Sequence, residues 1–269
     1  MDNRPIGVFD SGLGGLTVLK EIIKVLPNEN IVYFGDTARV PYGPRSKDTI
    51  IEYTFQAINF LKSKDVKAIV IACNTATARG LKEAKLKYDI PIIGVIEAGA
   101  RTAVYSTKNK VVGVIGTEGT ISSKSYNIEI QRLDEDIKIV SKACPLFVPI
   151  IEEGWANTEV AYLTAKEYLQ EVIDQGVDSL VLGCTHYPIL KRTIGRVVGD
   201  NIKLVNPAKE TAKDLKYILI QKDILRTKEQ GNPTYDYYVS DIPEKFANIG
   251  QQFLQRNMND VKKIEIQNY

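Results

Sequence analysis

Short runs of β-branched and other apolar residues alternate with amphipathic segments along almost the whole chain. Apolar runs of this length predict buried strands, here at residues 6–9, 31–34, 68–72, 92–96, 111–115, 137–140, 179–182 and 203–205. Apolar residues at helical spacing predict helices between them, most clearly within residues 16–26, 51–61, 158–176, 215–219 and 246–253. Such alternation is typical of an α/β protein with mainly parallel sheets covered by helices on both faces.

The first part of the chain resembles a later part. Ile-Gly-Val-Phe-Asp at 6–10 is similar to Val-Gly-Val-Ile-Gly at 112–116, and the segment around Cys73 is similar to the one around Cys184. A nearly constant offset between similar elements predicts two similar mainly parallel-sheet domains related by pseudo-symmetry, with the active site in the cleft between them. We place residues 1–96 plus 208–269 in the first domain and residues 97–207 in the second. The alternative is that buried parallel strands simply look alike.

The composition is that of an ordinary globular protein, with 44% hydrophobic and 25% charged residues. The 35 basic residues nearly balance the 33 acidic ones, and no block of like charge is long enough to suggest an arm that binds a nucleic acid. No apolar run is long enough to cross a bilayer, and the start of the chain lacks the pattern of a signal peptide. We therefore expect a cytoplasmic protein without nucleic-acid or membrane partners, in which Cys73, Cys144 and Cys184 are reduced thiols.

Two cysteines stand where α/β sheets bind their ligands. Cys73 and Cys184 each follow a predicted strand and precede a polar turn that opens a helix. Thr75 and Thr185 are suited to cap those helices. A thiol placed there meets backbone N–H groups and the positive end of a helix dipole, so we expect a lowered pKa. A cysteine standing alone is more often a buried apolar side chain, and Cys144 keeps that interpretation.

His186, the only histidine, lies two residues after Cys184. An imidazole there can protonate a substrate or hold the neighbouring thiol as thiolate. A zinc site formed by Cys73, Cys184 and His186 is an alternative, but no CxxC or HxxxH spacing supports it.

Two aspartates belong to the same sheet edge. Asp10 ends the first strand and Asp36 follows the second, so both are candidate site carboxylates, with a turn or helix cap as the alternative. The glycine-rich stretch at 10–15 allows close approach of a ligand, but it matches neither G-x-G-x-x-G nor a Walker sequence.

Four motifs together carry a family resemblance. They are Phe-Asp-Ser-Gly-Leu-Gly-Gly-Leu at 9–16, Tyr-Phe-Gly-Asp-Thr-Ala-Arg-Val-Pro-Tyr-Gly at 33–43, Ala-Cys-Asn-Thr-Ala at 72–76 and Gly-Cys-Thr-His-Tyr-Pro at 183–188. In sequence, order and spacing they closely resemble the motifs of bacterial glutamate racemase, within the aspartate/glutamate racemase superfamily. The resemblance covers essentially the whole chain, and the four motifs are specific as a set although each alone is weak.

The resemblance implies racemisation of glutamate by two cysteines, without pyridoxal phosphate or metal. Cys73 would act on D-glutamate and Cys184 on L-glutamate, on opposite faces of the α-carbon. The neighbouring catalytic groups implied by the family are Asp10, His186, Asp36 and Glu152. The implied substrate-binding residues are Asp10, Ser11, Tyr42, Gly43, Asn74, Thr75, Thr117, Thr185 and His186. The family also implies a homodimer that supplies D-glutamate for peptidoglycan, and hence for the cell wall and cell shape.

Two departures from the family pattern bear on these expectations. Asn206 stands in a turn that more often carries Asp or Ser, and its role stays open. Few residues precede the first motif, so we expect activity without a peptidoglycan-precursor activator. The alternative functions are racemisation of another acidic amino acid, such as aspartate, and a non-catalytic thiol-based redox or ligand-binding protein.

Overall fold

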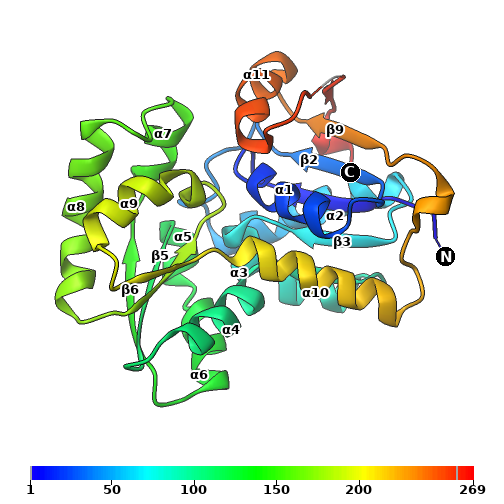
Figure 1. The fold of residues 1–269 in the computed structure, drawn as a ribbon. Coiled ribbons are helices and arrows are strands. Elements are labelled where there is room, and N and C mark those ends of the chain that lie inside the picture. Colours follow the sequence, from blue (N-terminus) through cyan, green and yellow to red (C-terminus); the bar gives the residue numbers. More distant parts are fainter. Residues whose placement is uncertain (1, 259) are drawn as a thin grey trace.

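The computed structural model describes residues 2–258 and 260–269. Its strands form two separate sheets in which all pairs are parallel, with helices packed on both faces (Figure 1). The strands are β1 (Ile6–Asp10), β2 (Ile31–Gly35), β3 (Ala68–Ile71), β4 (Ile92–Gly94), β5 (Val111–Gly116), β6 (Lys138–Ala143), β7 (Ser179–Gly183), β8 (Lys203–Val205), β9 (Tyr235–Val239) and β10 (Lys262–Lys263).

The helices include the five segments that amphipathic spacing predicted most clearly, and further helices lie between them, the longest with 14 residues. Ser46 caps the second helix by accepting a hydrogen bond from the Thr49 amide at 3.2 Å. The helices are α1 (Leu16–Val25), α2 (Lys47–Ser63), α3 (Asn74–Lys87), α4 (Ile96–Ser106), α5 (Glu118–Ser122), α6 (Ser125–Leu133), α7 (Phe147–Glu152), α8 (Glu159–Asp174), α9 (Lys191–Val198), α10 (Pro207–Gln221) and α11 (Pro243–Leu254), with 3₁₀ turns η1 (Tyr187–Leu190), η2 (Lys228–Gln230) and η3 (Ile266–Asn268).

The two sheets repeat one strand order. The first is β10-β9-β2-β1-β3-β4 and the second is β6-β5-β7-β8, so β5 to β8 correspond one by one to β1 to β4. This confirms the predicted α/β fold with two similar halves. The boundaries proposed between the halves fall in the first turns of α4 and α10, two helices that pack against each other (Figure 1), and these boundaries stay a prediction.

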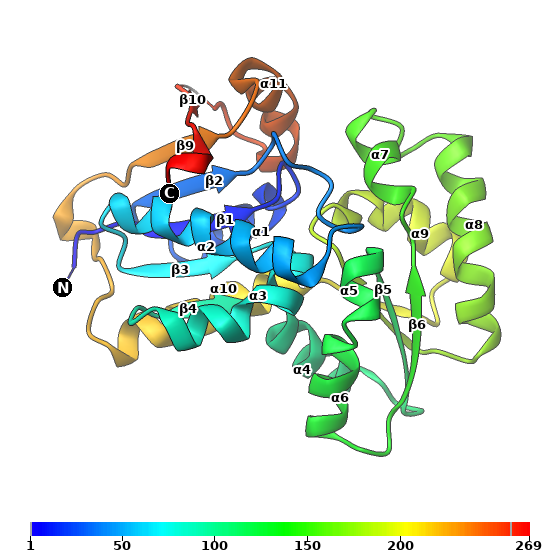
Figure 2. The same ribbon diagram turned by 180° about the vertical axis from the view of Figure 1, so that it is seen from behind.

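The last part of the chain returns to the first sheet, as expected from its helical spacing. Helices α10 and α11 both pack on α1. Strands β9 and β10, which the hydrophobic pattern did not predict, extend the sheet beyond β2 (Figure 2). The predicted strand at 92–96 is shorter than expected because α4 begins at Ile96. No helix among the described residues combines the length and the apolar character needed to cross a membrane.

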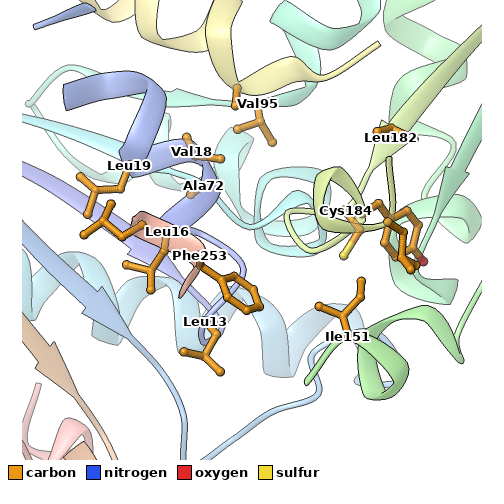
Figure 3. Close-up of a cluster of buried hydrophobic side chains, with 14 of the residues drawn as sticks. Leu13, Leu16, Val18, Leu19, Ala72, Val95, Ile151, Leu182, Cys184 and Phe253 are labelled. Carbon is orange, nitrogen blue, oxygen red and sulfur yellow. The ribbon is translucent and has the colours of Figure 1, made fainter. Parts of the chain in front are cut away.

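One apolar core joins the two halves. Leu16 and Leu19 of α1 and Phe253 of α11 pack in the same buried cluster as Leu182 of β7 and Cys184 (Figure 3). Full burial of a side chain such as leucine stabilises a fold by about 1.5–3 kcal/mol. This shared core therefore holds the ends of the two sheets next to each other.

Candidate active site

A cavity of about 490 Å³ lies at the carboxyl edges of both sheets, within the range typical of small-molecule sites. Its walls come from segments that follow β1, β2, β3, β5, β6 and β7, so both halves contribute to one site. Most of the side chains predicted from the sequence line it: Ser11, Tyr42, Gly43, Cys73, Asn74, Thr75, Thr117, Glu152, Cys184, Thr185 and His186. The cavity therefore lies where the sequence predicted an active site, between the two similar halves.

Cys73 and Cys184 follow equivalent strands and line this same cavity. Cys73 is itself the N-cap of α3, where its Sγ accepts a hydrogen bond from the Ala76 amide at 3.5 Å. Its thiol donates to Ser11 Oγ at 3.7 Å. Cys184 Sγ lies 3.9 Å from His186 Nδ1. Both thiols are thus held in place by polar contacts although they are almost completely buried.

The expected lowering of the Cys73 pKa is wrong. Burial, reinforced by the negative charge of Asp10, raises the pKa of the Cys73 thiol to about 12. The amide of Ala76 and the hydroxyl of Ser11 oppose this rise, but desolvation of the thiolate outweighs them. In this structure Cys73 is consequently a protonated thiol at neutral pH.

Cys184 stands beside a charged imidazole. His186 Nε2 lies 3.1 Å from Glu152 Oε1, and its Nδ1 faces Cys184. Burial lowers the pKa of His186, but its contacts with Cys184 and Glu152 prevail and raise it to about 10. Burial likewise raises the pKa of Glu152, and the hydrogen bond with His186 more than offsets this and lowers it. At neutral pH the pair is therefore imidazolium and carboxylate, with the positive charge next to Cys184.

Asp10 lies behind the cavity wall and is fully buried. Its carboxylate accepts hydrogen bonds from the Gly12 amide at 3.0 Å and from Thr185 Oγ1 at 3.3 Å. Burial raises its pKa. Thr185 does not cap a helix as predicted, because its hydroxyl bonds Asp10 and η1 has no side-chain cap. A Cβ at Gly14 would lie 2.3 Å from Thr185 Oγ1, so this close packing requires glycine.

Asp36 is also fully buried, and it supports the wall at Tyr42. Its carboxylate accepts hydrogen bonds from the Tyr42 hydroxyl, from Arg39 Nε at 2.6 Å and from Ser240 Oγ at 2.8 Å. Asp36 itself is not among the residues that line the cavity. The structure thus places this predicted catalytic carboxylate one layer behind the site.

Three threonine hydroxyls meet across the two halves. Thr75 Oγ1 lies 2.8 Å from Thr117 Oγ1 and 3.3 Å from Thr120 Oγ1. The predicted capping role of Thr75 is wrong, since Cys73 caps α3 and Thr75 lies inside that helix. Thr117 instead caps α5. The hydroxyls join one wall of the cavity to the other.

Sequence reasoning missed the remaining lining residues. These are mostly apolar or proline side chains, namely Val40, Pro41, Pro44, Glu118, Pro145, Val148 and Pro149. Val40 and Pro41 lie inside a quoted motif. Pro44, Pro145, Val148 and Pro149 carry no signal of their own because an apolar wall needs no particular spacing, and Glu118 belongs to none of the quoted motifs.

Two further expectations concern metal and Asn206. Within residues 2–258 and 260–269, no group of three or more His, Cys, Asp or Glu side chains is placed to hold a metal ion. Asn206 is the N-cap of α10, where its Oδ1 accepts a hydrogen bond from the Ala208 amide at 3.1 Å.

Comparison with known proteins places this chain in a family. The model of the Asp/Glu/Hydantoin racemase family matches residues 6–215. Glutamate racemase from Geobacter metallireducens is 51% identical over 265 residues, which are 98% of this chain and 97% of the relative. The crystal structure of glutamate racemase from Francisella tularensis in complex with D-glutamate matches with a TM-score of 0.93 at 42% identity, over 100% of both chains.

A further solved structure agrees. Glutamate racemase from Thermus thermophilus, in complex with β-chloro-D-alanine, matches with a TM-score of 0.90 at 38% identity over 100% of both chains. Matches at this identity and coverage reach well beyond a shared fold. The chain therefore belongs to the Asp/Glu/Hydantoin racemase family and is an isomerase of the amino-acid racemase type.

Proposed function

We propose that this protein interconverts L- and D-glutamate, with Cys73 and Cys184 as the two acid–base groups. The observation that carries the proposal is the pair of buried thiols that follow equivalent strands and line one cavity. A racemase must remove a proton from one face of the α-carbon and supply one to the other. Two similar groups on two similar halves suit a reaction whose directions differ only in handedness.

In the direction from L- to D-glutamate, the thiolate of Cys184 takes the α-proton. The electron pair of the broken C–H bond stays on the α-carbon, and Cys73 then gives its thiol proton to the opposite face. Cys184 ends as thiol and Cys73 as thiolate, which is the form that accepts D-glutamate for the reverse reaction. The pKa of about 12 at Cys73 favours the thiol form that starts this cycle, and the imidazolium of His186 places a positive charge beside Cys184.

The α-proton of an amino acid is a weak acid, so the site has to stabilise a developing carbanion. Positioned acid–base groups contribute about 10²–10⁴-fold in rate. Preorganised donors in a cavity screened from water supply the larger electrostatic part. The side-chain amide of Asn74 and the hydroxyls of Thr75 and Thr117 line the cavity and can serve this purpose and bind the substrate carboxylates.

The proposed reaction uses neither pyridoxal phosphate nor metal. Pyridoxal phosphate enzymes hold their cofactor as a lysine imine, and no lysine is found among the described residues that line the cavity. We further propose that the enzyme works as a cytoplasmic homodimer and supplies D-glutamate for peptidoglycan, in keeping with its family.

The test is racemisation of each glutamate enantiomer followed by circular dichroism without added cofactor. Cys73→Ala and Cys184→Ala are each expected to abolish racemisation in both directions. Cys144→Ala is the matched control, because that buried thiol does not line the cavity and should leave racemisation intact.

Three results would contradict the proposal. Racemisation by the Cys73→Ala or the Cys184→Ala variant would exclude the two-thiol mechanism. Turnover of aspartate but not of glutamate by the wild type would assign the other acidic substrate. Reversible Cys73–Cys184 bonding with ligand binding but no racemisation would assign a redox or binding role.

A further inference from the structure

Tyr126 of α6 touches the residues next to both thiols. Its hydroxyl donates a hydrogen bond to Asn74 Oδ1 at 2.7 Å, and Asn74 directly follows Cys73. Its ring lies against Gly183, which directly precedes Cys184, since a Cβ there would be 3.1 Å from Tyr126 Cε2. Only 1% of Tyr126 is exposed. A side chain from the second half thus reaches the segments that hold both cysteines.

This hydrogen bond decides which end of the Asn74 amide faces the cavity. Asn74 lines the cavity, and its Oδ1 is turned toward Tyr126. In the described part of the chain, Nδ2 has no hydrogen-bond partner, so its two N–H groups are available to a ligand.

The opposite orientation of the amide is disfavoured. With the amide reversed, Nδ2 would donate to the tyrosine oxygen, and the buried hydroxyl would lose the only acceptor that it has among the described residues. Burial also raises the pKa of Tyr126, which keeps the hydroxyl protonated and able to donate. The tyrosine therefore holds the carbonyl end of Asn74 away from the cavity.

We propose that Tyr126 is a positioning residue that orients Asn74 so that its amide N–H groups bind a carboxylate of the substrate. The proposal rests on the proposed racemisation of glutamate and adds one residue to it. A reversed amide would present a carbonyl oxygen to an anionic substrate, which repels it. Gly99 helps to make room for this arrangement, because a Cβ there would lie 3.1 Å from the Tyr126 hydroxyl oxygen.

The test is steady-state racemisation of both enantiomers by Tyr126→Phe, which keeps the ring and removes the hydroxyl. We expect the KM for each enantiomer to rise by about five- to tenfold, with kcat changing much less. Since the enantiomers have equal free energies, the loss in kcat/KM must be the same in both directions.

Tyr88→Phe is the matched control. The Tyr88 hydroxyl also donates to an asparagine Oδ1, that of Asn59, at 2.8 Å, but this pair lies outside the cavity. Loss of this bond should leave both KM values unchanged. A rise in KM in both variants would show a general effect of losing a buried hydroxyl and would overturn the proposal.

A double-mutant cycle with Asn74→Ala separates positioning from structural weakening. If Tyr126 acts through Asn74, adding Tyr126→Phe to Asn74→Ala leaves the already raised KM unchanged. A further rise of the same size as in the wild-type background would overturn the proposal. Inactivity of the wild-type enzyme toward glutamate would instead overturn the proposed function, so the two failures are distinct.

A second variant tests the same orientation with the tyrosine intact, should Tyr126→Phe fail to fold. In Asn74→Asp, one carboxylate oxygen can accept from Tyr126 while the other presents negative charge to the cavity. We expect KM to rise by more than about tenfold. An unchanged KM would mean that this side chain does not face the substrate carboxylate.

Discussion

Replacing Glu152 by Gln tests whether its charge keeps His186 protonated beside Cys184. Glutamine has nearly the shape of glutamate and can still form a hydrogen bond, but it lacks the negative charge. In the wild type, Glu152 Oε1 lies 3.1 Å from His186 Nε2, and its contact is one of the causes that raise the pKa of His186 to about 10.

The size of the effect follows from this geometry. An opposite charge at close range changes a pKa by about 1–3. The side chain of Glu152 is 33% exposed, so solvent screening places its contribution toward the lower part of that range. We expect the pKa of His186 to fall by about 1–2 in Glu152→Gln, which corresponds to about 1.5–3 kcal/mol of lost preference for the imidazolium.

The effect on stability has a defined sign. Because the folded-state pKa of His186 lies above its ordinary value of 6.5, the pair stabilises the fold fully below about pH 6.5 and loses this contribution as the pH rises through about 10. The pKa of Glu152 is lowered, so the carboxylate remains ionised near pH 6. The difference in unfolding free energy between wild type and Glu152→Gln should therefore be larger at pH 6 than above pH 10.

The assay is a proton NMR titration of the imidazole, which is unambiguous because the chain has 1 histidine. Glu153→Gln is the control, since Glu153 is exposed and its charge does not contact His186. We expect the midpoint to fall in Glu152→Gln only, and the alkaline limb of kcat/KM to move with it. A wild-type midpoint near 6.5, or equal midpoints in wild type and Glu152→Gln, would refute the reasoning.

Three other predictions follow from buried contacts. Lys67→Met should lower the unfolding free energy in urea by about 3–5 kcal/mol, because it leaves Glu29 buried without the partner now 2.6 Å away, and a loss below about 1 kcal/mol would contradict this. Gly14→Ala should abolish racemisation, since the new Cβ would lie 2.4 Å from His186 Nδ1. Gly195→Ala is its control and should leave racemisation intact, because a Cβ at Gly195 meets nothing within 4 Å. Equal activity of the two variants would argue against close packing at Gly14. Alkylation of Cys73 by iodoacetamide, followed by mass spectrometry, should keep accelerating above pH 9 because its thiol has a pKa of about 12, and a plateau at pH 9 would contradict that value.

The hydrophobic pattern predicted most strands of both sheets, because central strands such as β1, β3 and β7 are buried on both faces and therefore read as continuous apolar runs. Strand β9 escaped prediction because polar Asp236 interrupts it and only Tyr237 and Val239 are buried. Strand β10 has 2 residues, too few for any pattern. Both strands extend the first sheet beyond β2, and their own residues do not indicate that they pair there.

Candidate site residues could be predicted because the carboxyl ends of parallel strands determine where their side chains gather. The contacts and pKa shifts of each residue could not be predicted, since they depend on partners far away in the sequence. Asp36 lies behind the wall because Ser240, from the far end of the chain, bonds it. The rise in the Cys73 pKa comes first from burial, which a local helix-terminus argument does not include. Tyr126 carried no signal because its partner Asn74 belongs to the other half.

The fate of the α-proton in D₂O tests the two-thiol account most directly. L-Glutamate with protium at the α-carbon is incubated briefly with the enzyme, and the two enantiomers are separated and examined by NMR. If different thiols remove and supply the proton, the D-glutamate formed carries deuterium while the recovered L-glutamate keeps its protium. D-Glutamate that retains the original protium, or L-glutamate that exchanges as fast as product forms, would show a single base acting on both faces and would contradict the account.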